Sequence, residues 1–348
     1  MIIDELNVPI LLAPMAGGPS TPELTVAVTE AGGFGQLAAG YLTAKDIATR
    51  ILATRAATDA PFGVNLFAPG PATPADRIAA YLAELGREHE LGEARHNTDD
   101  WDAKLDLLTT DPVAVASFTF GCPSTEDIAR LHAVGSEAWV TVTSPAEADL
   151  AIAAGADVLI AQGSEAGGHR ASFIDDPTDD PTDPLTLLAL LQLLRARTDR
   201  PIVASGGLAT GAGIAAVLAA GAAAAQLGTA FLRCREAGTN PVHRAALPTD
   251  TPTMLTRAFT GRRARGLRNR FLDEHTAGAP AAYPEIHYAT APLRAAARSA
   301  GNTDEVNLWA GQTHALTDEL PAGELVHRLA AETKSALESA LSRRIKVC

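Results

Sequence analysis

Along the first two-thirds of the chain, short apolar runs alternate with longer alanine-rich stretches in which apolar residues recur at helical spacing. The apolar runs end near glycine or proline, which is typical of buried strands. Several of the longer stretches begin at Ser or Thr and many end at Gly, which is typical of capped helices. The runs that predict strands are residues 9–14, 33–38, 62–67, 113–120, 137–142, 157–162, 201–206 and 223–228.

Strands that alternate with helices in this way predict parallel crossover connections. An α/β fold of the (β/α)8 TIM-barrel type accommodates them best, and a doubly wound open sheet is the alternative. An internal repeat in the sequence favours the barrel. Residues 151–168 and 215–231 share the same order of helix end, Gly-Ala, strand and polar glycine turn.

The alternation is interrupted once and then fades. Residues 85–111 are more polar than their surroundings, and we expect an insertion there, after the third helix. The pattern disappears after about residue 235. We therefore expect a barrel over 1–235, a smaller helical part without paired strands over 236–320 on the substrate side, and a closing helix over 321–348 that returns to the barrel.

Composition excludes several classes of function. A formal net charge of −13 over 348 residues argues against nucleic acid or an anionic membrane as the main partner. The most apolar window, 214–232, is mostly alanine and is interrupted by glycine, so we expect no membrane span. The three cysteines are far apart in the sequence, so we expect free thiols in a reducing cytoplasm. No cluster of His, Cys or carboxylate residues suggests a metal site. The arginine-rich stretch 261–270 is expected to form internal salt bridges or solvated surface.

Polar residues and glycines gather where the predicted strands end, which is where barrels bind ligands. The strand over 157–162 ends in Gln162 and is followed by "SEAGGH", in which two glycines precede a histidine. The strands over 201–206 and 223–228 end in "SGG" and "QLGT", and turns of this kind can present backbone N–H groups to an anion. We expect a phosphate there, although tight turns alone are the alternative. No GxGxxG motif follows the first strand. The expected ligand is a phosphorylated aromatic cofactor.

Several long motifs in this order resemble the nitronate monooxygenase family, formerly called 2-nitropropane dioxygenases. They are residues 9–41, 62–67, 161–170, 201–232, 259–271 and 308–312. The resemblance covers nearly the whole chain. It implies a TIM barrel with one non-covalent FMN, and oxidation of alkyl nitronates by O2 to a carbonyl compound and nitrite, with neutral nitroalkanes as a further candidate substrate.

The resemblance also implies roles for single residues. His169 is expected to be the active-site histidine, facing the substrate above the flavin. The residues expected along the flavin ring are Ala13, Pro14, Met15, Asn65, Gln162, Gly167 and Gly168. Those expected to hold the phosphate are Gly206, Gly207, Gln226, Gly228 and Thr229.

Some alternatives stay open at this point. On the same barrel, an NAD(P)H-dependent flavin reductase of enoyl thioesters or quinones is the second hypothesis, and a flavin-binding protein without catalysis is the third. The acidic run 175–184 is expected to be a solvated loop, with a lid as the alternative, and His314 to be structural, with pocket lining as the alternative. Oligomeric state, monomer or homodimer, is open. The histidines expected at the surface are His89, His96, His132, His243, His275 and His327.

Overall fold

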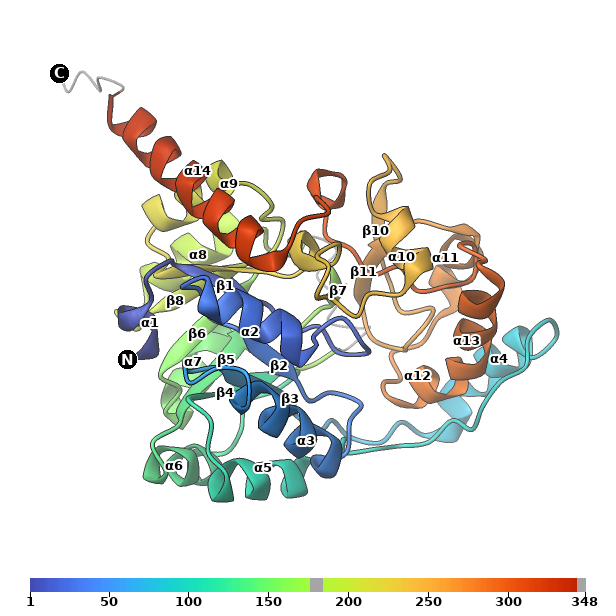
Figure 1. The fold of residues 1–348 in the computed structure, drawn as a ribbon. Coiled ribbons are helices and arrows are strands. Elements are labelled where there is room, and N and C mark those ends of the chain that lie inside the picture. Colours follow the sequence, from blue (N-terminus) through green and yellow to red (C-terminus); the bar gives the residue numbers. More distant parts are fainter. Residues whose placement is uncertain (176–183, 343–348) are drawn as a thin grey trace.

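The computed structural model describes residues 1–175 and 184–342, and its centre is a parallel barrel (Figure 1). In this part of the chain the strands of the large sheet follow the order β1-β9-β8-β6-β5-β4-β3-β2. Leu11 of β1 pairs in parallel with Phe34, just before β2, and this bridge closes the ring. The TIM-barrel prediction is therefore confirmed, and the open sheet is excluded. The barrel strands are β1 (Ile10–Leu12), β2 (Gln36–Ala38), β3 (Gly63–Phe67), β4 (Val115–Thr119), β5 (Glu137–Val142), β6 (Val158–Gln162), β8 (Ile202–Ser205) and β9 (Ala224–Leu227).

Helices surround the barrel, and hydroxyl side chains cap the amino-terminal ends of several of them. The hydroxyls of Thr21, Ser144 and Thr210, for example, each accept a backbone N–H from the first turn of the helix that follows. The helices between consecutive strands are α2 (Pro22–Glu30), α3 (Ala44–Arg55), α5 (Trp101–Thr110), α6 (Thr125–Ala133), α7 (Pro145–Ala154), α8 (Leu187–Arg195) and α9 (Gly211–Ala219).

The barrel interior is apolar at one end and polar at the other. Phe34 and Trp139 fill the amino-terminal end with ring centroids 5.5 Å apart, and Ile3 of α1 (Ile2–Glu5) belongs to the same buried cluster. Nearer the carboxyl end, Gln36 and Ser117 are buried and hydrogen-bonded to each other. Because apolar side chains fill the amino-terminal end of the barrel, we expect a ligand to bind at the carboxyl end.

After β9 the chain builds a second layer over the carboxyl end of the barrel. The absence of paired strands predicted for 236–320 is wrong. The strands β10 (Thr253–Thr256) and β11 (Ala264–Leu267) form an antiparallel hairpin, and β11 also pairs with β7 (Gly168–His169). The other elements of this layer are η1 (Thr229–Phe231), α10 (Pro241–Ala246), α11 (Arg270–His275), η2 (Thr276–Gly278), α12 (Glu285–Ala289), α13 (Ala291–Ala300) and η3 (His314–Leu316).

The chain between β3 and β4, which includes the polar stretch 85–111, contributes to both layers. Helix α5 packs against α3 and α6 in the outer ring of the barrel. By contrast α4 (Ala75–Leu85) lies beside the second layer in Figure 1, where Tyr81 shares a buried cluster with Phe259 and Phe271. The domain boundaries expected from the sequence stay a prediction.

The last helix, α14 (Ala322–Ser342), packs against α2 and α9 on the outside of the barrel (Figure 1). Its Glu332 carboxylate accepts a hydrogen bond from the N–H of Gly211 at the start of α9 (2.9 Å). No helix within the described residues is long and apolar enough to cross a membrane.

Candidate active site

A cavity of about 900 Å³ opens between the carboxyl ends of the barrel strands and the second layer. The strand ends form its floor, and side chains from residues 238–313 form much of its roof. All of the residues that the sequence predicts for the site line this one cavity: Ala13, Pro14, Met15, Asn65, Gln162, Gly167, Gly168, His169, Gly206, Gly207, Gln226, Gly228 and Thr229. The contact that each makes with a ligand stays a prediction.

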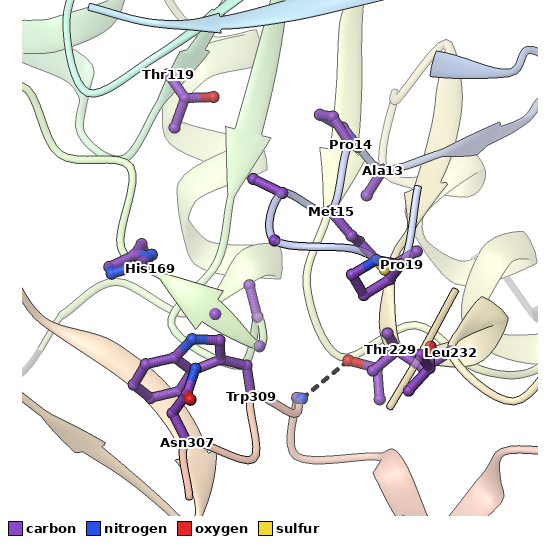
Figure 2. Close-up of a pocket in the computed structure, with 18 of the residues that line it drawn as sticks. Ala13, Pro14, Met15, Pro19, Thr119, His169, Thr229, Leu232, Asn307 and Trp309 are labelled. Carbon is purple, nitrogen blue, oxygen red and sulfur yellow. Dashed lines mark hydrogen bonds between the residues drawn. The ribbon is translucent and has the colours of Figure 1, made fainter. Parts of the chain in front are cut away.

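One end of the cavity is formed by the turns that follow β8 and β9. Gly207 has φ +65°, and a Cβ there would lie 2.9 Å from Cβ of Glu165, so a larger residue would strain this turn. The Thr229 hydroxyl accepts a hydrogen bond from Gly311 N–H (3.0 Å), which leaves its own proton for a ligand (Figure 2). At the start of α9 the N–H of Gly211 already donates to Glu332, so this N–H is not free for a ligand.

Amide side chains also line the cavity, and two of them, Asn65 and Gln226, are almost fully buried. Asn65 is 2% exposed, and its Nδ2 donates to Ser117 Oγ and Thr119 Oγ1, both at 3.1 Å. Gln226 is 4% exposed, and its Oε1 is buried without a partner among the described residues. An unpaired buried acceptor costs roughly 1–3 kcal/mol. Gln226 therefore fits a ligand that brings its own N–H or hydroxyl, as a flavin does.

Gln162 holds the strand that carries the histidine. Its Nε2 donates to the carbonyl of His169 (3.1 Å), and its Oε1 accepts from Ala171 N–H (2.9 Å). On the other side of this strand, Gly168 and His169 pair with β11. Strand β7 is thus fixed between a barrel side chain and the hairpin, which explains how a glycine-rich segment holds a histidine in one position.

The hydrogen bonds around His169 favour one tautomer of its ring. The Thr260 hydroxyl lies 2.9 Å from His169 Nε2 and donates to the carbonyl of Arg262 at 3.2 Å. With the hydroxyl proton used there, this arrangement favours the tautomer that carries its proton on Nε2 and leaves Nδ1 as an acceptor. Burial, reinforced by the positive charges of Arg262 and Arg294, lowers the pKa of His169 to about 3. The imidazole is therefore neutral at physiological pH.

Aromatic rings enclose this histidine. The ring centroids of Tyr283 and Trp309 lie 5.6 Å from that of His169, and that of Phe120 lies 5.7 Å away. In Figure 2, His169 and Trp309 lie on the opposite side of the cavity from Pro19 and Leu232. A wall of this kind keeps bulk water from the imidazole.

The sequence analysis missed several residues of the roof. His287 stacks on Tyr41 with ring centroids 4.2 Å apart, and both line the cavity. His243, predicted at the surface, also lines the cavity, and that prediction is wrong. Its Nε2 lies 2.9 Å from the carbonyl of Trp309, and burial lowers its pKa to about 4. No local pattern marks these positions, because docking of the second layer brings them there.

The structure also bears on the predictions for His314 and for the arginine-rich stretch 261–270. The two ring nitrogens of His314 lie 2.8–2.9 Å from the carbonyls of Leu247 and Thr251, and His314 does not line the cavity, which agrees with a structural role. The arginine-rich stretch does form salt bridges, for example Arg268 with Asp273. Residues 176–183 of the acidic run lie outside the described residues.

A TIM barrel with a cavity at the carboxyl ends of its strands, lined by glycine turns and a buried neutral histidine, has the architecture of a barrel enzyme. A family model described as nitronate monooxygenase matches residues 2–332. A nitronate monooxygenase from Pseudomonas aeruginosa is 42% identical, over 94% of this chain and 96% of that protein. One from Paraburkholderia phytofirmans is 39% identical, over 96% of this chain and 94% of that protein.

Solved structures agree with these sequence relatives. A nitroalkane oxidase from Streptomyces ansochromogenes is 50% identical with a TM-score of 0.95, covering 98% of this chain and 99% of that one. FabK from Thermotoga maritima is 27% identical with a TM-score of 0.77, covering 98% and 97%. The chain belongs to the nitronate monooxygenase family, a family of oxidoreductases.

Proposed function

We propose that this chain is an FMN-dependent enzyme that oxidises alkyl nitronates with O2 to a carbonyl compound and nitrite. Its partners are thus small molecules. The observation that carries the proposal is the neutral His169, held in a cavity whose far end offers backbone and hydroxyl donors suited to a phosphate. Family membership supports the same chemistry.

The residues present fit FMN. The turns at Gly206–Gly207 and Gly228–Thr229 would hold the phosphate, and the unpaired Oε1 of Gln226 would accept a hydrogen bond from the cofactor. At Gly168, which has φ +75°, a Cβ would meet nothing within 4 Å, so the backbone leaves open space beside the cavity. Bound FMN would supply the redox chemistry, taking electrons from the nitronate and passing them to O2.

The chain itself positions the substrate and handles its proton. A neutral nitroalkane must lose a proton from carbon, and Nδ1 of His169 is the unprotonated atom that can accept it. A nitronate has already lost that proton, so toward it His169 has only an orienting role. The rings of Tyr283 and Trp309 keep water from this step.

One experiment separates this function from its alternative. The purified protein should be yellow, with about one FMN per chain. Anaerobic mixing with an alkyl nitronate should bleach the flavin absorbance, whereas NADH and NADPH should not. Bleaching by a pyridine nucleotide but not by nitronate would select the flavin reductase. A colourless protein that cannot be reconstituted with FMN would contradict both enzymes.

A further inference from the structure

Phe120, the residue that follows β4, has an unusual backbone conformation. Its φ of +76° lies in the left-handed region, which bulky side chains rarely adopt. The residue is 5% exposed and its ring lines the cavity, with its centroid 4.5 Å from that of Phe67 and 5.7 Å from that of His169. A strained residue of this kind persists only where its surroundings hold it, and such residues are frequent at active sites.

Arg262, which does not line the cavity, holds Phe120 from behind. Its guanidinium carbon lies 4.1 Å from the centroid of the Phe120 ring, which is a cation–π contact. The same guanidinium donates through Nε to the carbonyl of Arg170 (3.2 Å) and through Nη2 to the carbonyl of Ser172. Both carbonyls follow His169 in the chain. One side chain therefore holds the ring of Phe120 together with the segment that continues from β7.

The charge of Arg262 has no carboxylate of its own. The residue is 7% exposed and forms no salt bridge within the described part of the chain. Asp175 is the carboxylate with the strongest effect on it, but Asp175 forms its salt bridges with Arg257 and Arg263. Burial of a cation without its own counter-ion is unfavourable. The folded chain nevertheless keeps this charge close to His169.

The charge acts on the imidazole of His169. Among the described residues, the ionisable groups that act on this imidazole or touch its ring are Arg262, Arg294, Asp175, Tyr283 and His287. Burial is the main cause of the low pKa of His169; Arg262 and then Arg294 lower the pKa further, and Asp175 raises it. Arg262 is thus the charged residue with the largest effect on this pKa.

Two of these groups contribute no charge at neutral pH. Burial raises the pKa of Tyr283 well above its usual value and lowers the pKa of His287 well below it, so both side chains are neutral. The balance of charge around the imidazole is therefore set by two arginines and one aspartate.

We propose that Arg262 is a positioning residue of the active site, which holds the ring of Phe120 against His169 and opposes protonation of the imidazole. The inference rests on the proposed function, in which the substrate meets an imidazole that is fixed in place and free to accept a proton. Arg262 does not reach the cavity itself. It acts through the Phe120 ring, through the carbonyls after β7 and through its charge.

The test uses FMN-loaded enzyme in which the histidines carry nitrogen-15. The chemical shifts of the imidazole nitrogens of His169, assigned by comparison with His169→Asn, report its protonation between about pH 7.5 and pH 5. Arg262→Gln removes the charge, and Arg262→Lys keeps it. Arg235→Gln is the control, because Arg235 is exposed and does not line the cavity.

His169 should stay neutral over this range in wild type and in Arg235→Gln, because its pKa is about 3. In Arg262→Gln the charge is lost and water can enter the space of the guanidinium. Both changes raise the pKa of His169, so we expect a midpoint between about pH 5 and pH 6.5. Arg262→Lys should keep His169 neutral. With a nitroalkane that wild type accepts, kcat/KM in Arg262→Gln should fall below the same midpoint, whereas a purely structural loss would not change the pH profile.

Phe120→Leu separates the ring from the charge. Leucine fills most of the same space but offers no aromatic face to the guanidinium and no ring edge to His169. We expect kcat for an alkyl nitronate to fall about tenfold, with KM within about threefold, because the imidazole is held less precisely. His169 should stay neutral, because the charge of Arg262 is still present. This variant also tests the proposal if Arg262→Gln does not fold.

Three results would overturn the proposal. The first is a His169 that stays neutral down to pH 5 in folded Arg262→Gln. The second is the same titration in Arg262→Lys as in Arg262→Gln, which would assign the effect to lost packing rather than to lost charge. The third is an unchanged kcat in Phe120→Leu. If wild type oxidises no nitronate, the proposed function fails, and the titration of His169 still decides whether Arg262 controls its protonation.

Discussion

The two ends of the cavity are made in different ways. At the barrel end, the turns after β8 and β9 present glycine backbone and the hydroxyl of Thr229. At the opposite end, side chains from β7 and the second layer surround His169. The barrel end therefore depends on the path of the chain, whereas the other end depends on the identity of each side chain. We expect cofactor retention and substrate selection to respond to separate sets of mutations.

The largest separation is expected for His169→Asn. Asparagine keeps a hydrogen-bond donor but cannot act as a base near neutral pH. Turnover of a neutral nitroalkane should fall about 100-fold or more, while oxidation of preformed nitronate should fall only modestly, because general-base catalysis is worth roughly 10²–10⁴-fold. Steady-state kinetics with both forms of one nitro compound check this. If wild type does not use the neutral form, the nitronate arm alone remains.

The bound flavin serves as the control for His169→Asn. FMN content measured by absorbance should match wild type, because the mutation lies at the side-chain end. Equal losses on both substrate forms would assign His169 to orientation of the nitro group rather than to proton abstraction. Rates like wild type on both would remove it from the site.

At the barrel end, Thr229→Val should weaken FMN binding and leave the preference between the two substrate forms unchanged. Valine has nearly the same shape but no hydroxyl, so the phosphate loses a donor and Gly311 N–H loses its acceptor. We expect the Kd for FMN to rise roughly 10- to 100-fold, with the ratio of activities on the two substrate forms unchanged once FMN is saturating. Fluorescence titration of apoprotein with FMN measures this, and Thr229→Ser should stay near wild type.

Gly228 offers a graded version of the same test. A Cβ there would lie 3.4 Å from Cβ of Ala13 and 3.7 Å from Sδ of Met15, which is ordinary contact. Gly228→Ala should therefore be tolerated, whereas Gly228→Val should weaken FMN retention because it fills space that the ligand needs. FMN binding as tight to Gly228→Val as to wild type would contradict a close approach of the phosphate.

The same contrast explains what the sequence could predict. All eight barrel strands were found because each is a continuous apolar run between turn residues, which is a local signal. The turns after β8 and β9 were found because glycine is conspicuous at a strand end. The hairpin β10–β11 was missed, since its strands are four residues each and β7 has only two. Strands this short are stabilised by partners distant in sequence, which no local window contains.

The side-chain end of the cavity was only partly predictable. His169 stood out because glycines surround it. His287, in contrast, lies in a helical stretch with an ordinary pattern, and His243 looks like a surface residue of a short helix. Both reach the cavity only because the second layer docks on the barrel, where His287 stacks on the ring of Tyr41 and His243 lies beside the carbonyl of Trp309.

The histidines of this end should make stability depend on pH. Burial lowers the pKa of His169 to about 3 and of His243 to about 4, and the pKa of His287 lies well below its usual value. Between about pH 6.5 and pH 4, the unfolded chain therefore binds protons that the folded chain does not. The free energy of unfolding should fall as pH falls through this window, by up to about 1.4 kcal/mol per pH unit for each histidine.

His243→Gln checks that sign. Glutamine can still donate to the carbonyl of Trp309 but does not titrate, so the slope of stability against pH should decrease by up to about 1.4 kcal/mol per pH unit. Urea unfolding at pH 7, 6 and 5 with excess FMN gives the slope. His327→Gln is the control, because no interaction of His327 is seen in the described structure. An unchanged slope in His243→Gln would mean that this histidine titrates alike in the folded and the unfolded chain.

The smallest effect is expected at Thr260, which touches His169 but not the cofactor end. Its hydroxyl accepts the Nε2 proton while donating to the carbonyl of Arg262, and so keeps Nδ1 free to act as the base. Thr260→Val removes the hydroxyl with little change of shape, so the proton can move to Nδ1 in part of the molecules. One neutral hydrogen bond contributes about 1 kcal/mol, so kcat for a neutral nitroalkane should fall about fivefold.

Oxidation of the nitronate and binding of FMN should stay unchanged in Thr260→Val, because neither needs an unprotonated Nδ1. Thr260→Ser keeps the hydroxyl and should restore kcat for the neutral nitroalkane, whereas a purely steric role for the threonine methyl group predicts that serine fails. Equal losses of kcat on both substrate forms would show that Thr260 supports the position of the ring rather than its tautomer. His169 would then depend on Thr260 for the position of its ring and not for the place of its proton.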